Sequence, residues 1–243
     1  MAEEKPAGRH VHSIILVRHG QTSYNAEHRW QGQIDIPLNA VGLWQVERTG
    51  EELRRRYVDA APGGRRQLVV ASNLGRAFTT AQVFAAPLHL EVHPDSRLRE
   101  RSFGQWEGVT IEQASERWPE DFRSWMSSTG GELNHGAETK GHVGARGAQA
   151  IEDWAGRAGD DTDLFVFSHG SLISQSLQTL LGMSRTYPEF ANMDSMRNAH
   201  WARLTPRDLP DGQVRWCLVE YNLGPAIAMR GDWDEPRDVV AAD

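Results

Sequence analysis

The chain has 243 residues, enough for one large domain or two small ones, and its 39% hydrophobic and 24% charged residues are ordinary for a soluble globular protein. Its formal net charge of −7 argues against a general nucleic-acid binder, which needs a basic face, and no apolar run reaches the roughly 18 residues of a membrane span. The single cysteine, Cys217, excludes a disulfide within the chain, and the N-terminus lacks the apolar stretch of a secretory signal, so we expect a reducing, cytoplasmic location.

The first half of the chain alternates apolar runs with segments of helical periodicity. We predict a flexible lead-in, a strand, a helix, a second strand and a second helix at residues 1–12, 14–16, 39–57, 68–71 and 74–86. Asn39 is a suitable N-cap for the first helix, and Pro87 ends the second.

The second half begins with a predicted helical insertion at residues 109–156. Within it, Thr110 and Gln113 have the spacing of a capping box, and Pro119 interrupts the helical pattern. Residues 127–136 are polar and contain glycine, so we expect a mobile loop there. A strand, a helix and two late strands are predicted to follow at residues 164–168, 172–182, 199–204 and 214–221.

Strands that alternate with helices are typical of an α/β fold with a largely parallel sheet and helices on both faces. We expect a single domain over residues 13–223 that carries the insertion at 109–156. The stretch 224–243 is acidic and lacks periodicity, so we expect a loosely ordered tail.

Two histidines follow predicted strands in the same way. Arg18 and His19 precede Gly20 just after the first strand, and His169 and Gly170 follow the strand at 164–168. Open α/β sheets carry their chemistry at the carboxyl ends of the strands. The pattern therefore predicts two imidazoles that face one pocket.

These residues and several further motifs resemble the histidine phosphatase superfamily, also called the phosphoglycerate mutase-like family. The motifs occur in the family's order and span most of the chain, at residues 16–22, 25, 31–38, 71–77, 80–81, 98–100, 103–108 and 168–170. The resemblance implies a three-layer α/β/α fold and a metal-independent phosphomonoester hydrolase that needs no cofactor. It further implies that the substrate is a small phosphate ester, that the reaction passes through a phosphohistidine intermediate, and that the protein is a homodimer.

The predicted chemistry fits the residue types. A phosphoryl group is a dianion, and arginine suits it because its planar fork meets two oxygens and keeps its charge. Arg18 and Arg76 would supply these forks, and the amide of Asn25 one further hydrogen bond. The resemblance makes His19 the nucleophile and His169 the second imidazole, which donates to the phosphate.

Glu100 is the expected proton donor to the leaving oxygen, on the strength of the family motif at residues 98–108. Glu107 is the competing carboxylate, and a surface ion pair of Glu100 with Arg99 or Arg101 is the structural alternative. Nothing else in the sequence separates these possibilities.

The resemblance predicts four substrate-binding residues, which are Asn25, Thr22, Gln31 and Gly170. The segment around Gln31 is similar to actinobacterial members of the family. The family's usual Gly-Gly-Glu-Ser is Gly136-Ala137-Glu138-Thr139 here, so the chain departs from the pattern at Ala137 and Thr139. Gly141 and Gly144 weaken the start of the next helix, so we expect a looser lid over the pocket.

Three other functions stay open. A cofactor-dependent phosphoglycerate mutase would share the catalytic core, but the short insertion between Gly108 and Glu138 favours hydrolysis. A non-catalytic phosphate-binding module would have lost one of the five core residues, and none is missing. A metal-dependent hydrolase is disfavoured because the ten histidines form no H-E-x-x-H motif and no paired-cysteine site exists. The substrate is expected to be a sugar or glycerate phosphate.

Overall fold

A computed structural model describes residues 11–61, 64–183, 193–211, 213–229, 231–236 and 239 of the chain. One sheet of six strands has the order β3-β2-β4-β1-β5-β6. The strands are β1 (Ser13–Arg18), β2 (Arg66–Ala71), β3 (Val92–Pro94), β4 (Thr162–Ser168), β5 (Trp201–Asp208) and β6 (Val214–Leu223). Strands β3, β2, β4 and β1 pair in parallel, while β5 is antiparallel to both of its neighbours, β1 and β6, which confirms the predicted mostly parallel sheet.

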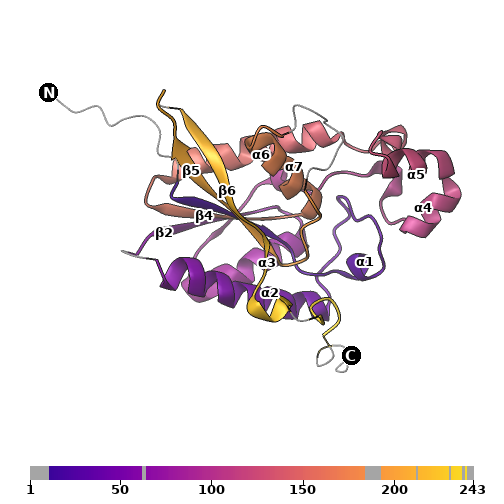
Figure 1. Cartoon of the computed structure of the whole chain (residues 1–243). Coiled ribbons are helices and arrows are strands. Elements are labelled where there is room, and N and C mark those ends of the chain that lie inside the picture. The colour runs from indigo at the N-terminus through magenta and orange to yellow at the C-terminus, as the bar shows by residue number, and fades with distance from the viewer. Residues whose placement is uncertain are drawn as a thin grey trace.

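Helices cover both faces of this sheet, as the sequence predicted (Figure 1). The pair α2 (Ala40–Leu53) and α3 (Gly75–Ala85) lies on one face, and the pair α6 (Lys140–Ala158) and α7 (Gly170–Leu180) on the other. Side chains alternate along a strand. Ile14 and Leu16 of β1 therefore pack in the core under α6 and α7, while Ile15 and Val17 pack in the core over α2 and α3.

The register of the two central strands decides where the site forms. Strands β1 and β4 are parallel neighbours, and Arg18 pairs with Ser168. The residues that follow, His19 and His169, therefore leave the sheet at the same edge. This is the juxtaposition that the strand-end rule predicted.

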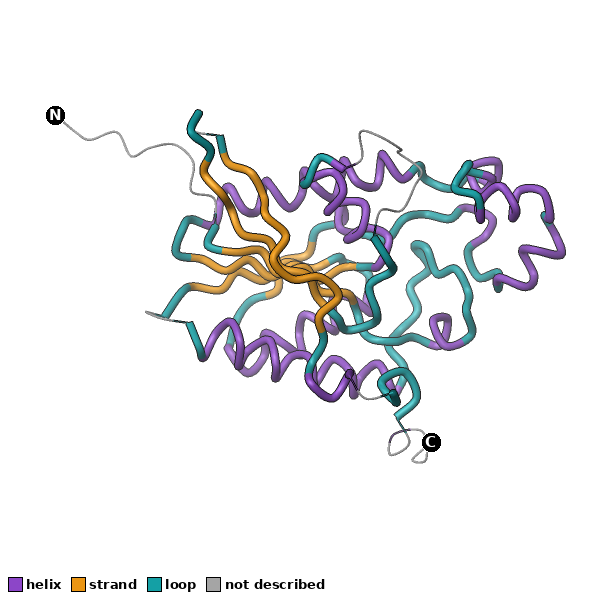
Figure 2. The backbone as a smooth tube through the Cα atoms, viewed as in Figure 1, coloured by secondary structure: helices purple, strands orange, loops and turns teal. Residues whose placement is uncertain are grey.

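The insertion contains α4 (Ile111–Arg117), α5 (Pro119–Met126) and a 3₁₀ turn, η5 (Gly131–His135). It extends beyond the sheet near the short helix α1 (Ser23–Ala26), as Figure 2 shows. The capping box at Thr110 is confirmed, and Pro119 begins α5. The expected mobile loop at 127–136 is wrong, because η5 is anchored there by Glu132, which is 1% exposed and paired with Arg101.

Helix boundaries differ from the predictions by a few residues. Asn39 caps α2 as expected, but a π-helix, η1 (Arg54–Asp59), continues after Leu53. Helix α6 runs unbroken through Gly141 and Gly144, so the expected loose helix start is also wrong. The remaining short helices are η2 (Ala86–Leu88), η3 (Ser96–Leu98), η4 (Gly104–Trp106) and η7 (Ala226–Met229).

The ends of the chain are more ordered than predicted. The expected lead-in at 1–12 ends two residues early, because Val11 is buried in the core and the His12 amide donates to the carbonyl of Thr162; residues 1–10 lie outside the described part. The tail is not loose over residues 225–229 and 231–236, where η7 forms and Trp233 is fully buried. Cys217 is half-buried on β6, and no described helix is long and apolar enough to cross a membrane.

Candidate active site

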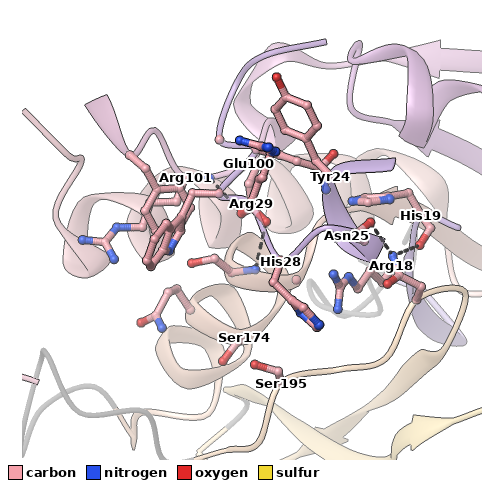
Figure 3. A pocket seen from close by; sticks show the side chains of 18 of the residues that line it. Arg18, His19, Tyr24, Asn25, His28, Arg29, Glu100, Arg101, Ser174 and Ser195 are labelled. Atoms are coloured by element: carbon pink, nitrogen blue, oxygen red, sulfur yellow. Dashed lines mark hydrogen bonds between the residues drawn. The ribbon is translucent and has the colours of Figure 1, made fainter. Parts of the chain in front are cut away.

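A pocket of about 540 Å³ opens at the carboxyl ends of β1 and β4. Its walls come from the loop after β1, from helix α7, from the insertion and from the loop before β5 (Figure 3). Seven of the nine residues predicted as site residues line it, which are Arg18, His19, Asn25, Gln31, Arg76, Glu100 and Gly170.

His19 is held in one orientation and one tautomer. Its ring is buried, and Nδ1 lies 2.6 Å from the carbonyl oxygen of Gly20. Because a carbonyl can only accept, Nδ1 carries the proton and Nε2 keeps its lone pair. Burial, together with the positive charges of Arg76 and Arg18, holds the pKa of His19 well below its usual 6.5. The imidazole is therefore neutral at pH 7.

His169 lies beside His19, with the two ring centroids 5.1 Å apart. It is fully buried behind the pocket lining, and its Nε2 is 2.8 Å from the hydroxyl of Ser72. The Ser72 hydroxyl accepts a bond from the amide of Leu74, so its proton can go to Nε2. His169 then carries its proton on Nδ1, which has no partner in the described structure. Burial and the charge of Arg76 hold the pKa of His169 well below 6.5.

Two arginines converge on the same space. Arg76, near the start of α3, is 1% exposed and donates to the carbonyls of Ile34 and Gly32, each at 2.8 Å. Arg18 donates to the carbonyl of Met196. In both guanidinium groups the buried Nε lacks a hydrogen-bond partner among the described residues. The pair provides fixed positive charge at the pocket floor.

Asn198 ties the loop after β1 together. Its amide donates to the carbonyls of His19 and Gly20, at 3.1 and 3.2 Å, and to Oδ1 of Asn25 at 3.1 Å. Oδ1 of Asn25 also accepts from Thr22, whose side chain caps α1. Thr22 is fully buried and does not line the pocket, unlike the other predicted substrate-binding residues.

The two candidate carboxylates lie in different places. Glu100 lines the pocket and accepts from the amides of Arg101, Leu172 and Ser171 at 2.8, 3.0 and 3.2 Å. Glu107 lies outside the pocket lining and accepts from the amides of Phe103 and Gln33, so it fixes a loop. The geometry therefore favours Glu100 over Glu107.

The surface ion pair considered for Glu100 is absent among the described residues. The guanidinium of Arg99 donates to Asn73, and that of Arg101 to Glu132 and to the carbonyl of Glu138. The carboxylate of Glu100 is held by backbone amides alone, two of them in the first turn of α7, where a helix favours negative charge.

Three groups of pocket residues were missed from the sequence. One comprises aromatic and apolar side chains around the insertion, which are Tyr24, Phe103, Ile111 and Trp125. The second comprises polar residues on α7 and on the loop before β5, which are Ser171, Ser174, Gln175 and Ser195. The third comprises basic side chains, which are His28, Arg29, Arg101 and Lys140. A helical face at positions 170, 171, 174 and 175 is a detectable pattern, but it does not reveal by itself which way the face points.

The segment after β6 packs behind the loop that carries His19. The indole of Trp233 donates to the carbonyl of Asn198 at 3.1 Å, and the side chain of Gln45 donates to the carbonyl of Trp233 at 3.0 Å. Gln45 also accepts from the amide of Gln21, whose side chain donates to the carbonyl of Asp234. This segment therefore fixes the loop that carries His19 from outside.

The assembled groups suit attack on a phosphoryl centre. His19 lines this pocket with a neutral imidazole, beside one carboxylate, Glu100, and a set of basic side chains: Arg18, Arg29, Arg76, Arg101 and Lys140. The unpartnered Nδ1 of His169 lies behind this lining. Among the described residues, no group of three or more histidine, cysteine, aspartate or glutamate side chains is placed to hold a metal ion.

Comparison with known proteins gives independent evidence on the family of this chain. The sequence profile of the histidine phosphatase superfamily (branch 1) matches residues 14–216. A glucosyl-3-phosphoglycerate phosphatase of Mycolicibacterium vanbaalenii is 30% identical over 231 residues, which cover 90% of this chain and 97% of the relative. Phosphoserine phosphatase 1 of Hydrogenobacter thermophilus is 31% identical over 170 residues, which cover 70% of this chain and 76% of the relative.

A solved structure gives the same picture. The mycobacterial glucosyl-3-phosphoglycerate phosphatase in complex with VO3 superposes with a TM-score of 0.74 at 28% identity, over 88% of this chain and 100% of that one. The described fold is therefore similar to that enzyme along most of its length.

Proposed function

Because the chain belongs to the histidine phosphatase superfamily (branch 1), we propose that it hydrolyses phosphate monoesters of small metabolites through a phosphohistidine on His19. The observation that carries the mechanism is the state of His19, which is buried, neutral and bonded through Nδ1 to the carbonyl of Gly20. Its Nε2 lone pair is the nucleophile that such a reaction needs.

In the first step, Nε2 of His19 attacks phosphorus, and the bond between phosphorus and the ester oxygen breaks. Glu100 in its protonated form gives its proton to the departing oxygen, so the leaving group departs as an alcohol. Arg18 and Arg76 neutralise the phosphoryl oxygens, and the N–H of His169 donates to one of them. The amide group of Asn25 supplies a further donor.

In the second step, water attacks the phosphohistidine. The carboxylate of Glu100 takes one proton from the water, and the bond between phosphorus and Nε2 breaks. Inorganic phosphate leaves, and both His19 and Glu100 return to their starting states. The place of Glu100 in the pocket lining, fixed by three backbone amides, supports it as the group that exchanges protons with the substrate.

The test is phosphate release from p-nitrophenyl phosphate in the presence of EDTA. His19→Ala should lower kcat by about 10³-fold or more, because the nucleophile is lost. His89→Ala is the matched control, since His89 is an exposed histidine at the end of η2 that does not line the pocket. Equal activity in the two variants would contradict the mechanism, and loss of wild-type activity in EDTA would indicate a metal-dependent enzyme.

The substrate is proposed to be a sugar or glycerate phosphate, in line with the relatives, one of which is named for a glucosylated phosphoglycerate. A parallel mutase assay with 3-phosphoglycerate separates hydrolysis from phosphoglycerate interconversion. We propose a cytoplasmic location from the single cysteine and a homodimer from the family resemblance. Light scattering of the purified chain tests the dimer.

A further inference from the structure

One wall of the pocket is built from a single face of α7. Gly170, Ser171, Ser174 and Gln175 line the pocket, while Leu172 and its neighbours on the other face pack in the core. Residues one turn apart share a helix face, so this spacing places the four side by side. The wall carries neutral polar groups and no charge of its own.

Ser174 and Gln175 are the notable members of this wall. They are 8% and 7% exposed, yet neither the hydroxyl nor the amide group hydrogen-bonds to any residue that the structure describes. Neither polar group is among the fully buried side-chain atoms that lack a partner, so both stay accessible from the pocket. Both line the pocket, so a bound molecule is placed to supply a partner. Figure 3 shows Ser174 and Ser195 on the same side of the pocket.

Ser174 and Gln175 lie beyond the expected phosphate site, on the side where the leaving group of the substrate would extend. Gly170 begins α7 beside the guanidinium of Arg18, and the amides of Ser171 and Leu172 hold Glu100. Ser174 and Gln175 lie one turn further on, about 5.4 Å along the axis. A leaving group that receives its proton from Glu100 would extend past this turn.

The rest of the pocket has the shape for such a group. A volume of about 540 Å³ is in the range that encloses a whole small ligand, so there is room beyond the phosphate. Trp30, from the loop after α1, and Trp125, from the insertion, supply aromatic surface. A sugar or polyol has both features that this pocket offers to bind, namely hydroxyl groups that donate and accept and C–H faces that pack on aromatic rings.

We propose that Ser174 and Gln175 form a leaving-group subsite that binds hydroxyl groups, so that the preferred substrates are phosphate esters of polyhydroxylated alcohols. The inference rests on the proposed phosphatase activity and adds the residues that would recognise the hydroxyl groups of the substrate. A site built to hydrogen-bond a hydroxyl discriminates strongly against an analogue that lacks it, because the buried partners are then left unpaired.

The first measurement compares substrates on the wild-type enzyme. Hexose and pentose monophosphates are set against cyclohexylmethyl phosphate, which has a six-membered ring but no hydroxyl group. The best sugar phosphate should exceed cyclohexylmethyl phosphate in kcat/KM by about tenfold or more. If cyclohexylmethyl phosphate is hydrolysed as well as every sugar phosphate, the subsite does not exist.

The second measurement uses variants. Ser174→Ala and Gln175→Met should each lower the ratio of kcat/KM for the best sugar phosphate to kcat/KM for p-nitrophenyl phosphate by fivefold or more. Ser176→Ala is the matched control, because Ser176 lies on the same helix with a buried, unpartnered hydroxyl that does not line the pocket. The ratio for Ser176→Ala should stay at the wild-type value. The proposal is overturned if the ratio falls by less than fivefold in Ser174→Ala or Gln175→Met.

The two proposals fail in different ways. If the wild-type enzyme does not hydrolyse p-nitrophenyl phosphate or any sugar phosphate, the phosphatase activity itself is wrong. If it hydrolyses p-nitrophenyl phosphate while Ser174→Ala and Gln175→Met keep the wild-type substrate ratio, only the subsite is wrong.

Discussion

Two properties of individual residues decide how this site would react. They are the charge states of the two histidines and the identity of the carboxylate that lines the pocket. His19 and His169 are neutral because burial and two arginines disfavour their protonated forms. The sequence motifs predicted both histidines and both arginines. The family motif also favoured Glu100 over Glu107, and the structure adds the physical difference, because only Glu100 lines the pocket while Glu107 holds loop amides.

That choice can be tested by leaving-group dependence. Glu100→Gln should slow an alkyl phosphate by about 10²-fold or more but p-nitrophenyl phosphate much less, because nitrophenolate departs without a proton. Glu107→Gln is the control and should show no such dependence, since its carboxylate only anchors loop amides. Equal slowing of both esters by Glu100→Gln would argue against a proton donor.

Among the structural elements, the packing of α6 on α7 was the least predictable. Gly141 and Gly144 suggested a weak helix start, yet Gly144 and the later Gly147 face α7. A Cβ on Gly144 would lie 2.8 Å from the backbone oxygen of Gln175, and one on Gly147 would meet the hydroxyl of Ser176. The close approach needs glycine there, and only the tertiary arrangement reveals which side of α6 meets its neighbour.

A pair of glycine substitutions tests this account of α6. Gly144→Ala should lower the free energy of unfolding by about 1–3 kcal/mol, because the backbone of α7 must move. Gly141→Ala, where a Cβ would have no atom within 4 Å, should raise it by up to about 1 kcal/mol through lower backbone entropy of the unfolded chain. Urea unfolding measures both. Similar effects of the two substitutions would contradict close packing at Gly144.

At the scale of the whole molecule, the fold class and the position of the site followed from the sequence. His19 and His169 follow the strands predicted at 14–16 and 164–168, and they meet because β1 and β4 are parallel neighbours. The tail could not be predicted, since its composition is polar and aperiodic. Its order comes from distant partners, above all the contacts of Trp233 with Gln45 and Asn198.

Global stability should depend on pH through the buried histidines. His19 and His169 have native pKa values well below 6.5, and burial lowers the pKa of His200 to about 4. Below about pH 6.5 the unfolded chain binds protons that the native chain does not, so stability is greatest above this pH and falls on acidification. The fall is about 1.4 kcal/mol per pH unit for each such histidine.

Urea unfolding at pH 7.5, 6.5 and 5.5 measures this dependence in a range where most carboxylates stay ionised. His19→Asn removes one of the titrating groups and should make the fall shallower. A free energy of unfolding that stays constant from pH 7.5 to 5.5 would show that these histidines are not buried in neutral form.

The most direct test of the central claim is to trap the phosphorylated enzyme. The wild-type protein, in excess over a ³²P-labelled phosphate ester, is quenched in alkali within the first turnover and digested for mass spectrometry. The account predicts acid-labile, alkali-stable phosphate on His19 and none in His19→Ala. Phosphate on another residue, or turnover without any phosphorylated enzyme, would contradict it.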